Sequence, residues 1–121
     1  VDEVDLINPH GTSTPLADLR ESQAIHSVFG DRAWEIAISG TKSMTGHLMG
    51  AAGAVEGVFT VLSVYHQTAP ATINYSEPDP EIPLNVIHGE SKPMEIRYAM
   101  SDNIGLGGHN GAVVFKRYDG D

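Results

Sequence analysis

Two histidines, His10 and His47, lie in loops whose composition suits a catalytic site. Each loop follows an apolar stretch, is rich in small polar residues and leads into a stretch with helical spacing. Open α/β sheets place their ligand sites in loops at the carboxyl ends of strands. We therefore expect both imidazoles to face one cleft. The alternative is that each histidine only binds nearby backbone groups, and one sequence leaves that alternative open.

Two glycine-containing stretches resemble nucleotide-binding loops but do not fit them. In residues 40–43, Thr41 separates the glycine from the lysine, whereas a phosphate loop needs GxxxxGK[ST]. In residues 105–111, the third glycine position of a dinucleotide loop holds Asn110, and a strand follows where a helix is required. The second stretch can instead bring backbone N–H groups close to a ligand, as an oxyanion hole requires. A tight turn without a ligand is the alternative.

Composition excludes several classes of function. The 121 residues carry a net charge of -9, which argues against binding nucleic acid or an anionic membrane. There is no cysteine, so these residues contain no disulfide, no thiolate metal site and no cysteine nucleophile. The six histidines show neither HxH nor HExxH spacing, and we expect no metal site. No signal peptide is recognisable at the start, so a cytoplasmic location is the default expectation.

One segment, residues 47–66, is apolar and long enough to span a bilayer. It carries Glu56 near its middle, is dense in glycine and has no flanking basic anchors. We therefore expect a buried core helix and no membrane span.

The order of elements predicts an α/β domain with a mixed sheet and no second domain. We expect two helices, at residues 15–29 and 47–67, and polar loops at residues 40–46, 76–83, 88–95 and 103–111. The expected strands are residues 4–8, 35–39, 71–75, 84–87, 97–101 and 112–118.

Both helices carry a pattern that predicts which face is covered. In the first, Thr14 caps the helix and Pro15 takes its first position, with Arg20 and Glu21 on the solvent side. Its apolar face comprises Leu16, Leu19, Ala24, Ile25, Val28 and Phe29. In the second, glycines recur at steps of four, three and four and line one face, which predicts the close approach of another backbone. These are Gly46, Gly50, Gly53 and Gly57.

Three ordered motifs together resemble the C-terminal signature of the bacterial type II β-ketoacyl-acyl-carrier-protein synthases, the elongating condensing enzymes. They are residues 8–15 (NPHGTSTP), 41–47 (TKSMTGH) and 103–111 (NIGLGGHNG), and the resemblance extends over essentially the whole chain. It implies a thiolase-like fold in which two similar α/β halves pack as five layers, this chain being the C-terminal half. The implied reaction is a decarboxylative Claisen condensation in fatty-acid synthesis. Malonyl-carrier protein loses carbon dioxide, and its carbanion attacks an acyl thioester on a cysteine.

The resemblance also implies roles for individual residues. His10 and His47 would donate hydrogen bonds to the enolate-like thioester oxygen as neutral rings. Lys42 would hold the histidine network in place, and Glu56 would pair with it, which would ease the burial of its charge.

The remaining implied site residues bind the substrate. Thr12 and Thr14 match threonines that bind the phosphopantetheine arm of acyl carrier protein. The backbone N–H of Ile104, in the loop with Gly105 and Leu106, matches the oxyanion hole for the acyl-cysteine carbonyl. The substrates arrive on phosphopantetheine, and no further cofactor or metal is implied.

Two departures from the family pattern limit what the resemblance implies. The nucleophilic cysteine belongs to the N-terminal half of such enzymes, so we expect these 121 residues to act only with that half, in a homodimeric enzyme. Ile104 and Leu106 occupy positions that usually hold phenylalanines, which leaves gating and chain-length preference open. A non-catalytic partner, such as a chain-length-factor-like subunit, is the alternative. A thiolase fits poorly, because it needs a second cysteine near its C-terminus.

Overall fold

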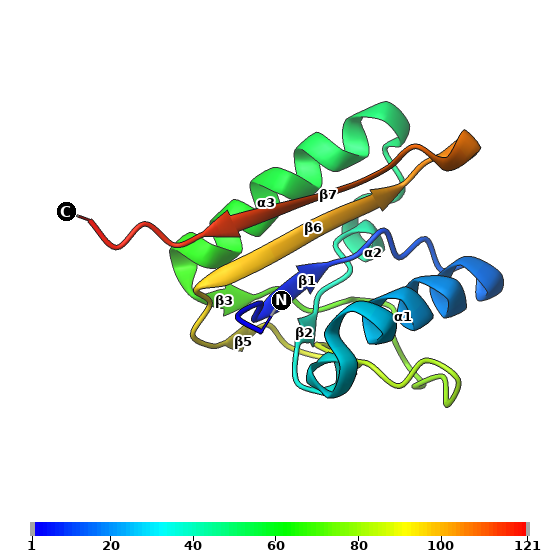
Figure 1. The fold of residues 1–121 in the computed structure, drawn as a ribbon, viewed down its shortest axis with the longest axis horizontal. Helices are drawn as coiled ribbons and strands as arrows, with labels where there is room; N and C mark the ends of the chain where they lie inside the picture. The colour runs from blue at the N-terminus through cyan, green and yellow to red at the C-terminus, as the bar shows by residue number, and fades with distance from the viewer. Residues whose placement is uncertain (1, 121) are drawn as a thin grey trace.

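The computed structural model describes residues 2–120. It contains a five-stranded mixed sheet in the order β4-β2-β1-β6-β7, in which the first four strands are parallel and β7 is antiparallel to β6. Figure 1 labels β2, β1, β6 and β7 of this sheet. The strands are β1 (Leu6–Asn8), β2 (Ala37–Ile38), β4 (Asn85–Val86), β6 (Tyr98–Ile104) and β7 (Asn110–Lys116). A separate antiparallel pair comprises β3 (Thr68–Ala69) and β5 (Lys92–Pro93).

Two long helices cover the two faces of this sheet. Helix α1 (Pro15–Phe29) packs on one face, where Ile25 and Phe29 join Ile7 and Ile38 in an apolar cluster. Helix α3 (Ala52–His66) packs on the other face along β6 and β7 (Figure 1), and its Val64 joins Leu6, Ala37 and Ala99. The alternation of β1 explains both clusters, since neighbouring strand residues point to opposite faces. The predicted α/β class and mixed sheet are confirmed.

Several element boundaries differ from the prediction. A short helix α2 (Lys42–Thr45) lies inside the expected loop 40–46, and 3₁₀ turns follow α1 (Gly30–Trp34), precede α3 (Met49–Ala51) and lie in the last loop (Leu106–Gly108). The long second helix therefore begins at Ala52 rather than near residue 47. Residues 71–75 form no strand and contribute only an isolated bridge from Thr72 to His88. Within the described residues, no helix is long and apolar enough to cross a membrane.

The predicted covered face of α1 is partly wrong. Leu16 and Val28 are 66% and 61% exposed, whereas Glu21 and Ser22 are buried. Glu21 is covered because its carboxylate is used at the end of β1, as described below. Thr14 does take the N-cap position, but its side chain makes no capping hydrogen bond.

The predicted glycine stripe is also only partly present. Gly46 and Gly50 precede α3, and Gly46 has a positive φ of 71° that ends α2. Gly53 and Gly57 do lie on α3 and face the sheet. A Cβ there would meet the side chains of Asn103 and Phe115 at 3.8 and 3.6 Å. The helix thus approaches side chains of β6 and β7, not another backbone of this chain.

Candidate active site

The site lies where β1, β2 and β6 end, at the same edge of the sheet. β2, the next strand in the chain, lies on one side of β1, and β6 lies on the other side. The strand order therefore reverses at β1. Open α/β sheets bind ligands at such a point. His10 follows β1, Lys42 follows β2, and Asn103 is near the end of β6.

The loop after β1 is held by a carboxylate from α1. Glu21 accepts the backbone N–H of His10 through Oε1 at 2.7 Å and that of Gly11 through Oε2 at 2.9 Å. These bonds pair two backbone donors that β1 leaves unsatisfied, and backbone N–H groups buried without partners are costly. The expected solvent position of Glu21 is therefore wrong: its carboxylate fixes the loop that carries His10.

Two buried side chains connect the first and second loops. Asn8 donates from Nδ2 to Thr41 Oγ1 at 3.0 Å, and its Oδ1 accepts the backbone N–H of Thr41 at 3.3 Å. Nδ2 also lies 3.4 Å from the carbonyl oxygen of Glu56 on α3. The ends of β1 and β2 and the helix that carries Glu56 are thus held in one arrangement.

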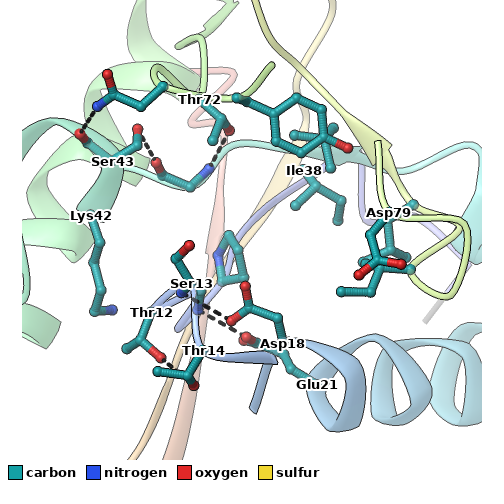
Figure 2. Close-up of a pocket in the computed structure, with 18 of the residues that line it drawn as sticks. Thr12, Ser13, Thr14, Asp18, Glu21, Ile38, Lys42, Ser43, Thr72 and Asp79 are labelled. Atoms are coloured by element: carbon teal, nitrogen blue, oxygen red, sulfur yellow. Dashed lines mark hydrogen bonds between the residues drawn. The ribbon is translucent and has the colours of Figure 1, made fainter. Parts of the chain in front are cut away.

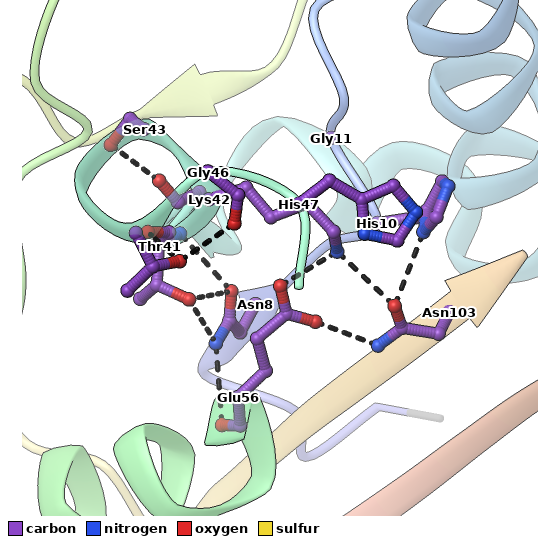
Figure 3. A network of polar contacts seen from close by, with 12 residues as sticks. Asn8, His10, Gly11, Thr41, Lys42, Ser43, Gly46, His47, Glu56 and Asn103 are labelled. Atoms are coloured by element: carbon purple, nitrogen blue, oxygen red, sulfur yellow. Dashed lines mark hydrogen bonds and ion pairs between the residues drawn. The ribbon is translucent and has the colours of Figure 1, made fainter. Parts of the chain in front are cut away.

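Lys42 and Glu56 form a buried ion pair (Figure 3). Lys42 Nζ lies 2.6 Å from Glu56 Oε1, and the two side chains are only 4% and 2% exposed. Lys42 Nζ also donates to Asn103 Oδ1 at 3.1 Å, and Asn103 Nδ2 donates to Glu56 Oε2 at 2.7 Å. The pairing of Lys42 with Glu56 expected from the sequence is present in the structure.

The two histidines meet beside this ion pair. Their ring centroids lie 5.3 Å apart and the ring planes are nearly perpendicular, so the two rings are neighbours. Of the two, His47 lines the cavity described below. His10 is buried and its Nδ1 lies 3.2 Å from Asn103 Oδ1. His47 is exposed and its Nδ1 accepts the backbone N–H of Met49 at 3.3 Å. Figure 3 shows both rings beside Asn103 and Lys42.

The glycine-rich loop joins β6 to β7, and one backbone N–H at its start is not used in the ladder between these two strands. The N–H of Gly105 donates to the carbonyl of His109 at 3.1 Å. Hydrogen-bonded and non-bonded pairs alternate in an antiparallel ladder, so the preceding pair, Ile104 with Asn110, is non-bonded. The N–H of Ile104 therefore points away from β7, towards the side on which β1 ends and His10 follows. Leu106 is 98% exposed.

A cavity of about 680 Å³ opens at this end of the sheet, and His47 is among the residues that line it. Figure 2 shows part of its lining. The cavity lies between α1 and residues 72–84, and four of the residues proposed from the sequence line it: Thr12, Thr14, Lys42 and His47. The hydroxyls of Thr12 and Thr14 lie 3.4 Å apart at its edge. A tethered substrate that entered through this cavity would reach His47.

A second carboxyl lies under the first loop. Asp102 is partly buried beside Glu21. Its burial raises the pKa of Asp102 to about 8, and so do the hydrogen bond to Glu21 and the negative charge of Glu21. The charge of Lys42 and the backbone of His10 lower this pKa. The Oδ1 atom of Asp102 is buried and has no hydrogen-bond partner among residues 2–120. Burial also raises the pKa of Asp18, on the first turn of α1.

Three of these residues were not proposed from the sequence. Glu21 is expected on the solvent side of its helix, Asn103 begins the expected loop 103–111, and Asp102 lies in no expected element. A weak signal existed for Asn103, because it continues the inward-facing positions of β6 after Ala99 and Ser101. An amide at such a position needs polar partners, and the buried charges of Lys42 and Glu56 supply them.

Comparison with known proteins agrees with this geometry. The profile of the family described as "Beta-ketoacyl synthase, C-terminal domain" matches residues 1–76, more than half of the sequence. The chain belongs to the β-ketoacyl synthase family. The family resemblance stated from the three motifs is therefore confirmed, and so is the thiolase-like fold of its members.

Individual relatives support the same assignment. The chain is 45% identical over 117 residues to 3-oxoacyl-[acyl-carrier-protein] synthase 2 of Staphylococcus aureus (strain COL), covering 97% of this chain and 28% of the relative. It is 50% identical over 116 residues to the enzyme of the same name from Coxiella burnetii, covering 96% and 28%. The chain thus spans less than a third of the length of these curated relatives.

Solved structures of ketosynthases share the fold. One is the ketosynthase of a type II polyketide synthase in complex with its acyl-carrier protein (AntDE:AntF), with a TM-score of 0.93 at 38% identity over 97% of this chain and 29% of that chain. Another is a β-ketoacyl synthase from Burkholderia phymatum STM815, with a TM-score of 0.88 at 39% identity over 96% of this chain and 28% of that chain.

Proposed function

We propose that this chain is the C-terminal part of an elongating β-ketoacyl-acyl-carrier-protein synthase of fatty-acid biosynthesis. Such an enzyme condenses malonyl-carrier protein with an acyl thioester and releases carbon dioxide. The observation that carries the proposal is the meeting of His10, His47 and the Lys42–Glu56 pair at one sheet edge, in a chain of this family. The partners we propose are acyl carrier protein, the cysteine-bearing N-terminal half and a second copy of the complete enzyme.

The proposed chemistry follows from where negative charge develops. Loss of carbon dioxide from the malonyl group places charge on the thioester oxygen, and preplaced donors stabilise that charge more in the transition state than in the ground state. His47 suits this role, because Nδ1 accepts the Met49 N–H and so leaves the proton of the neutral ring on Nε2.

The other residues hold the substrate and the histidines. We propose that the N–H of Ile104 binds the carbonyl of the acyl-cysteine, which would come from the N-terminal half. Thr12 and Thr14, at the edge of the cavity, would bind the phosphopantetheine arm. The ion pair of Lys42 and Glu56 lies beside the histidines and would determine the electrostatic environment of their rings. No cofactor beyond the carrier-bound substrates is needed for this reaction.

The test uses the complete synthase, meaning this sequence joined to the N-terminal part that its relatives carry. Supplied with acyl- and malonyl-carrier protein, it should release carbon dioxide and form the 3-oxoacyl product. The 121 residues alone should accept no acyl group, because covalent catalysis needs a thiolate and they contain no cysteine. A complete synthase that takes up the acyl group on its cysteine but never condenses it would instead indicate a non-catalytic partner.

A further inference from the structure

We infer that Asn103 is a positioning residue that keeps a proton on Nδ1 of His10, so that the neutral ring presents Nε2 as a hydrogen-bond acceptor. The inference deepens the proposed function and rests on it. The three family motifs by themselves give Asn103 no role. The inference also gives the two histidines different hydrogen-bonding roles.

The orientation of the Asn103 amide is set by two charged partners. Its Nδ2 lies 2.7 Å from Glu56 Oε2, and a carboxylate can only accept. Its Oδ1 lies 3.1 Å from Lys42 Nζ, and an ammonium can only donate. A flipped amide would place its NH₂ group against the ammonium and its oxygen against the carboxylate, so only one orientation satisfies both contacts.

This orientation decides which nitrogen of His10 carries the proton. Asn103 Oδ1 is an acceptor only, and it lies 3.2 Å from His10 Nδ1. The contact is a hydrogen bond only if Nδ1 is protonated. A neutral imidazole then has an unprotonated Nε2, which accepts hydrogen bonds and cannot donate one.

The surrounding charges do not offer His10 another partner at Nδ1. Glu21 binds the backbone N–H of His10 and not its ring, and Lys42 Nζ and Glu56 are paired with each other and with Asn103. Asp102, on β6, interacts with Glu21 and with the backbone of His10, not with its ring. The Asn103 oxygen is thus the group that selects the tautomer.

The two histidines are therefore not equivalent. The structure favours Nε2–H for His47, whose Nδ1 accepts a backbone N–H, and Nδ1–H for His10. The sequence-based expectation is that both rings donate as neutral imidazoles; the inference keeps that role for His47 and gives His10 an acceptor at Nε2 instead. In the proposed reaction His47 supplies the donor to the thioester oxygen, and His10 offers an acceptor beside the His47 ring.

The test reads the tautomer directly, in the complete synthase labelled with ¹⁵N-histidine. The ¹⁵N chemical shifts of the ring distinguish a protonated from an unprotonated nitrogen. They are recorded at pH values where they no longer change with pH. The signals that disappear in His10→Ala are assigned to His10. We expect Nδ1–H for His10 in the unaltered protein. Asn103→Leu removes the acceptor and should shift His10 towards Nε2–H. Asn103→Asp keeps an oxygen at that position and should retain a proton on Nδ1.

Matched controls and activity complete the experiment. Asn85→Leu and Asn85→Asp make the same changes at a half-buried asparagine on β4, which donates to the backbone carbonyl of Glu35, and should leave the His10 signals unchanged. Asn103→Leu should also slow malonyl decarboxylation about tenfold, as expected for the loss of one bond in a buried polar network. Nε2–H on His10 in the unaltered protein, or an unchanged tautomer in Asn103→Leu, would overturn the inference. Because the tautomer is read without turnover, an inactive synthase would contradict the proposed function and leave this result standing.

Discussion

Lys42 and Glu56 form an ion pair that is almost completely shielded from solvent, with 2.6 Å between Nζ and Oε1. Two charges removed from water are stabilised mainly by each other and by the hydrogen bonds around them, here those of Asn103. Loss of either partner leaves an uncompensated buried charge beside the histidines.

We therefore predict that Lys42→Met or Glu56→Gln destabilises the complete synthase by about 3–5 kcal/mol. The double variant Lys42→Met with Glu56→Leu should recover part of that loss, because no isolated charge remains. The control is Glu35→Gln in the exposed pair with Arg32, where about 0–1 kcal/mol is expected. Denaturant unfolding gives the free energy of unfolding of each of these four variants. A loss at Lys42 no larger than at Glu35 would contradict the prediction.

Asp102 predicts a pH dependence of stability. Its pKa of about 8 in the folded protein lies above the usual value of 3.8 for an aspartate, so the folded state binds the additional proton between about pH 4 and pH 8. Stability should therefore fall as the pH rises through that window, by at most about 1.4 kcal/mol per pH unit from this group. Below this window Asp102 is protonated in both the folded and the unfolded state, so its full contribution to stability is present.

Asp102→Asn should remove this slope, and its amide can donate to Glu21. The variant should gain stability relative to the unaltered protein at pH 8 more than at pH 5. Unfolding free energies measured at both values check this, with Asp31→Asn at an exposed aspartate as the control. Parallel curves for the unaltered protein and Asp102→Asn would rule out a titrating Asp102.

Gly105 allows the chain to come close to itself at the start of the last loop. A Cβ at this position would lie 2.6 Å from the carbonyl oxygen of His109, which is too close for the backbone to remain in place. Gly105→Ala should cost about 1–3 kcal/mol and displace the N–H of Ile104, so condensation should slow as well. Gly111→Ala is the matched control, since a Cβ there meets nothing within 4 Å. Equal unfolding temperatures and rates for both variants would count against this role.

The outer side of α3 predicts self-association of the 121 residues when they are produced alone. Val58, Val61, Leu62 and Tyr65 lie three and four residues apart and are 44–78% exposed, so they form one apolar stripe on the side away from the sheet. The family resemblance implies that this helix lies centrally in the complete synthase, between the two halves. Sedimentation should show oligomers whose size grows with concentration, and Val61→Lys with Tyr65→Lys should reduce them. Val28→Lys, at an exposed valine on α1, should not. A monomer at all concentrations would contradict the prediction.

Residue spacing and loop composition predicted part of this site from the sequence, but not the rest. The loops with His10 and His47 follow buried strands, and strand order alone brings them to one edge. The burial of Glu21 could not be predicted from helical spacing, since its partners are two backbone N–H groups ten and eleven residues earlier. The role of Asn103 depends on contacts with residues 47 and 61 positions away, which only the sheet register creates.

The last prediction separates His47 from His109 in the complete synthase. His47 carries the Nε2–H that is available to the malonyl thioester, whereas His109 is an exposed residue of the last loop. Removal of one preorganised donor to a developing oxyanion costs ~10²–10³ in rate. His47→Ala should therefore slow malonyl decarboxylation by about that factor. It should affect acyl transfer to the cysteine less, because we propose that the acyl carbonyl binds the N–H of Ile104. His109→Ala should change either step far less. Decarboxylation and acyl-enzyme formation are measured separately for each variant. If His47→Ala decarboxylates normally, or if His109→Ala is equally slow, the donor is not His47.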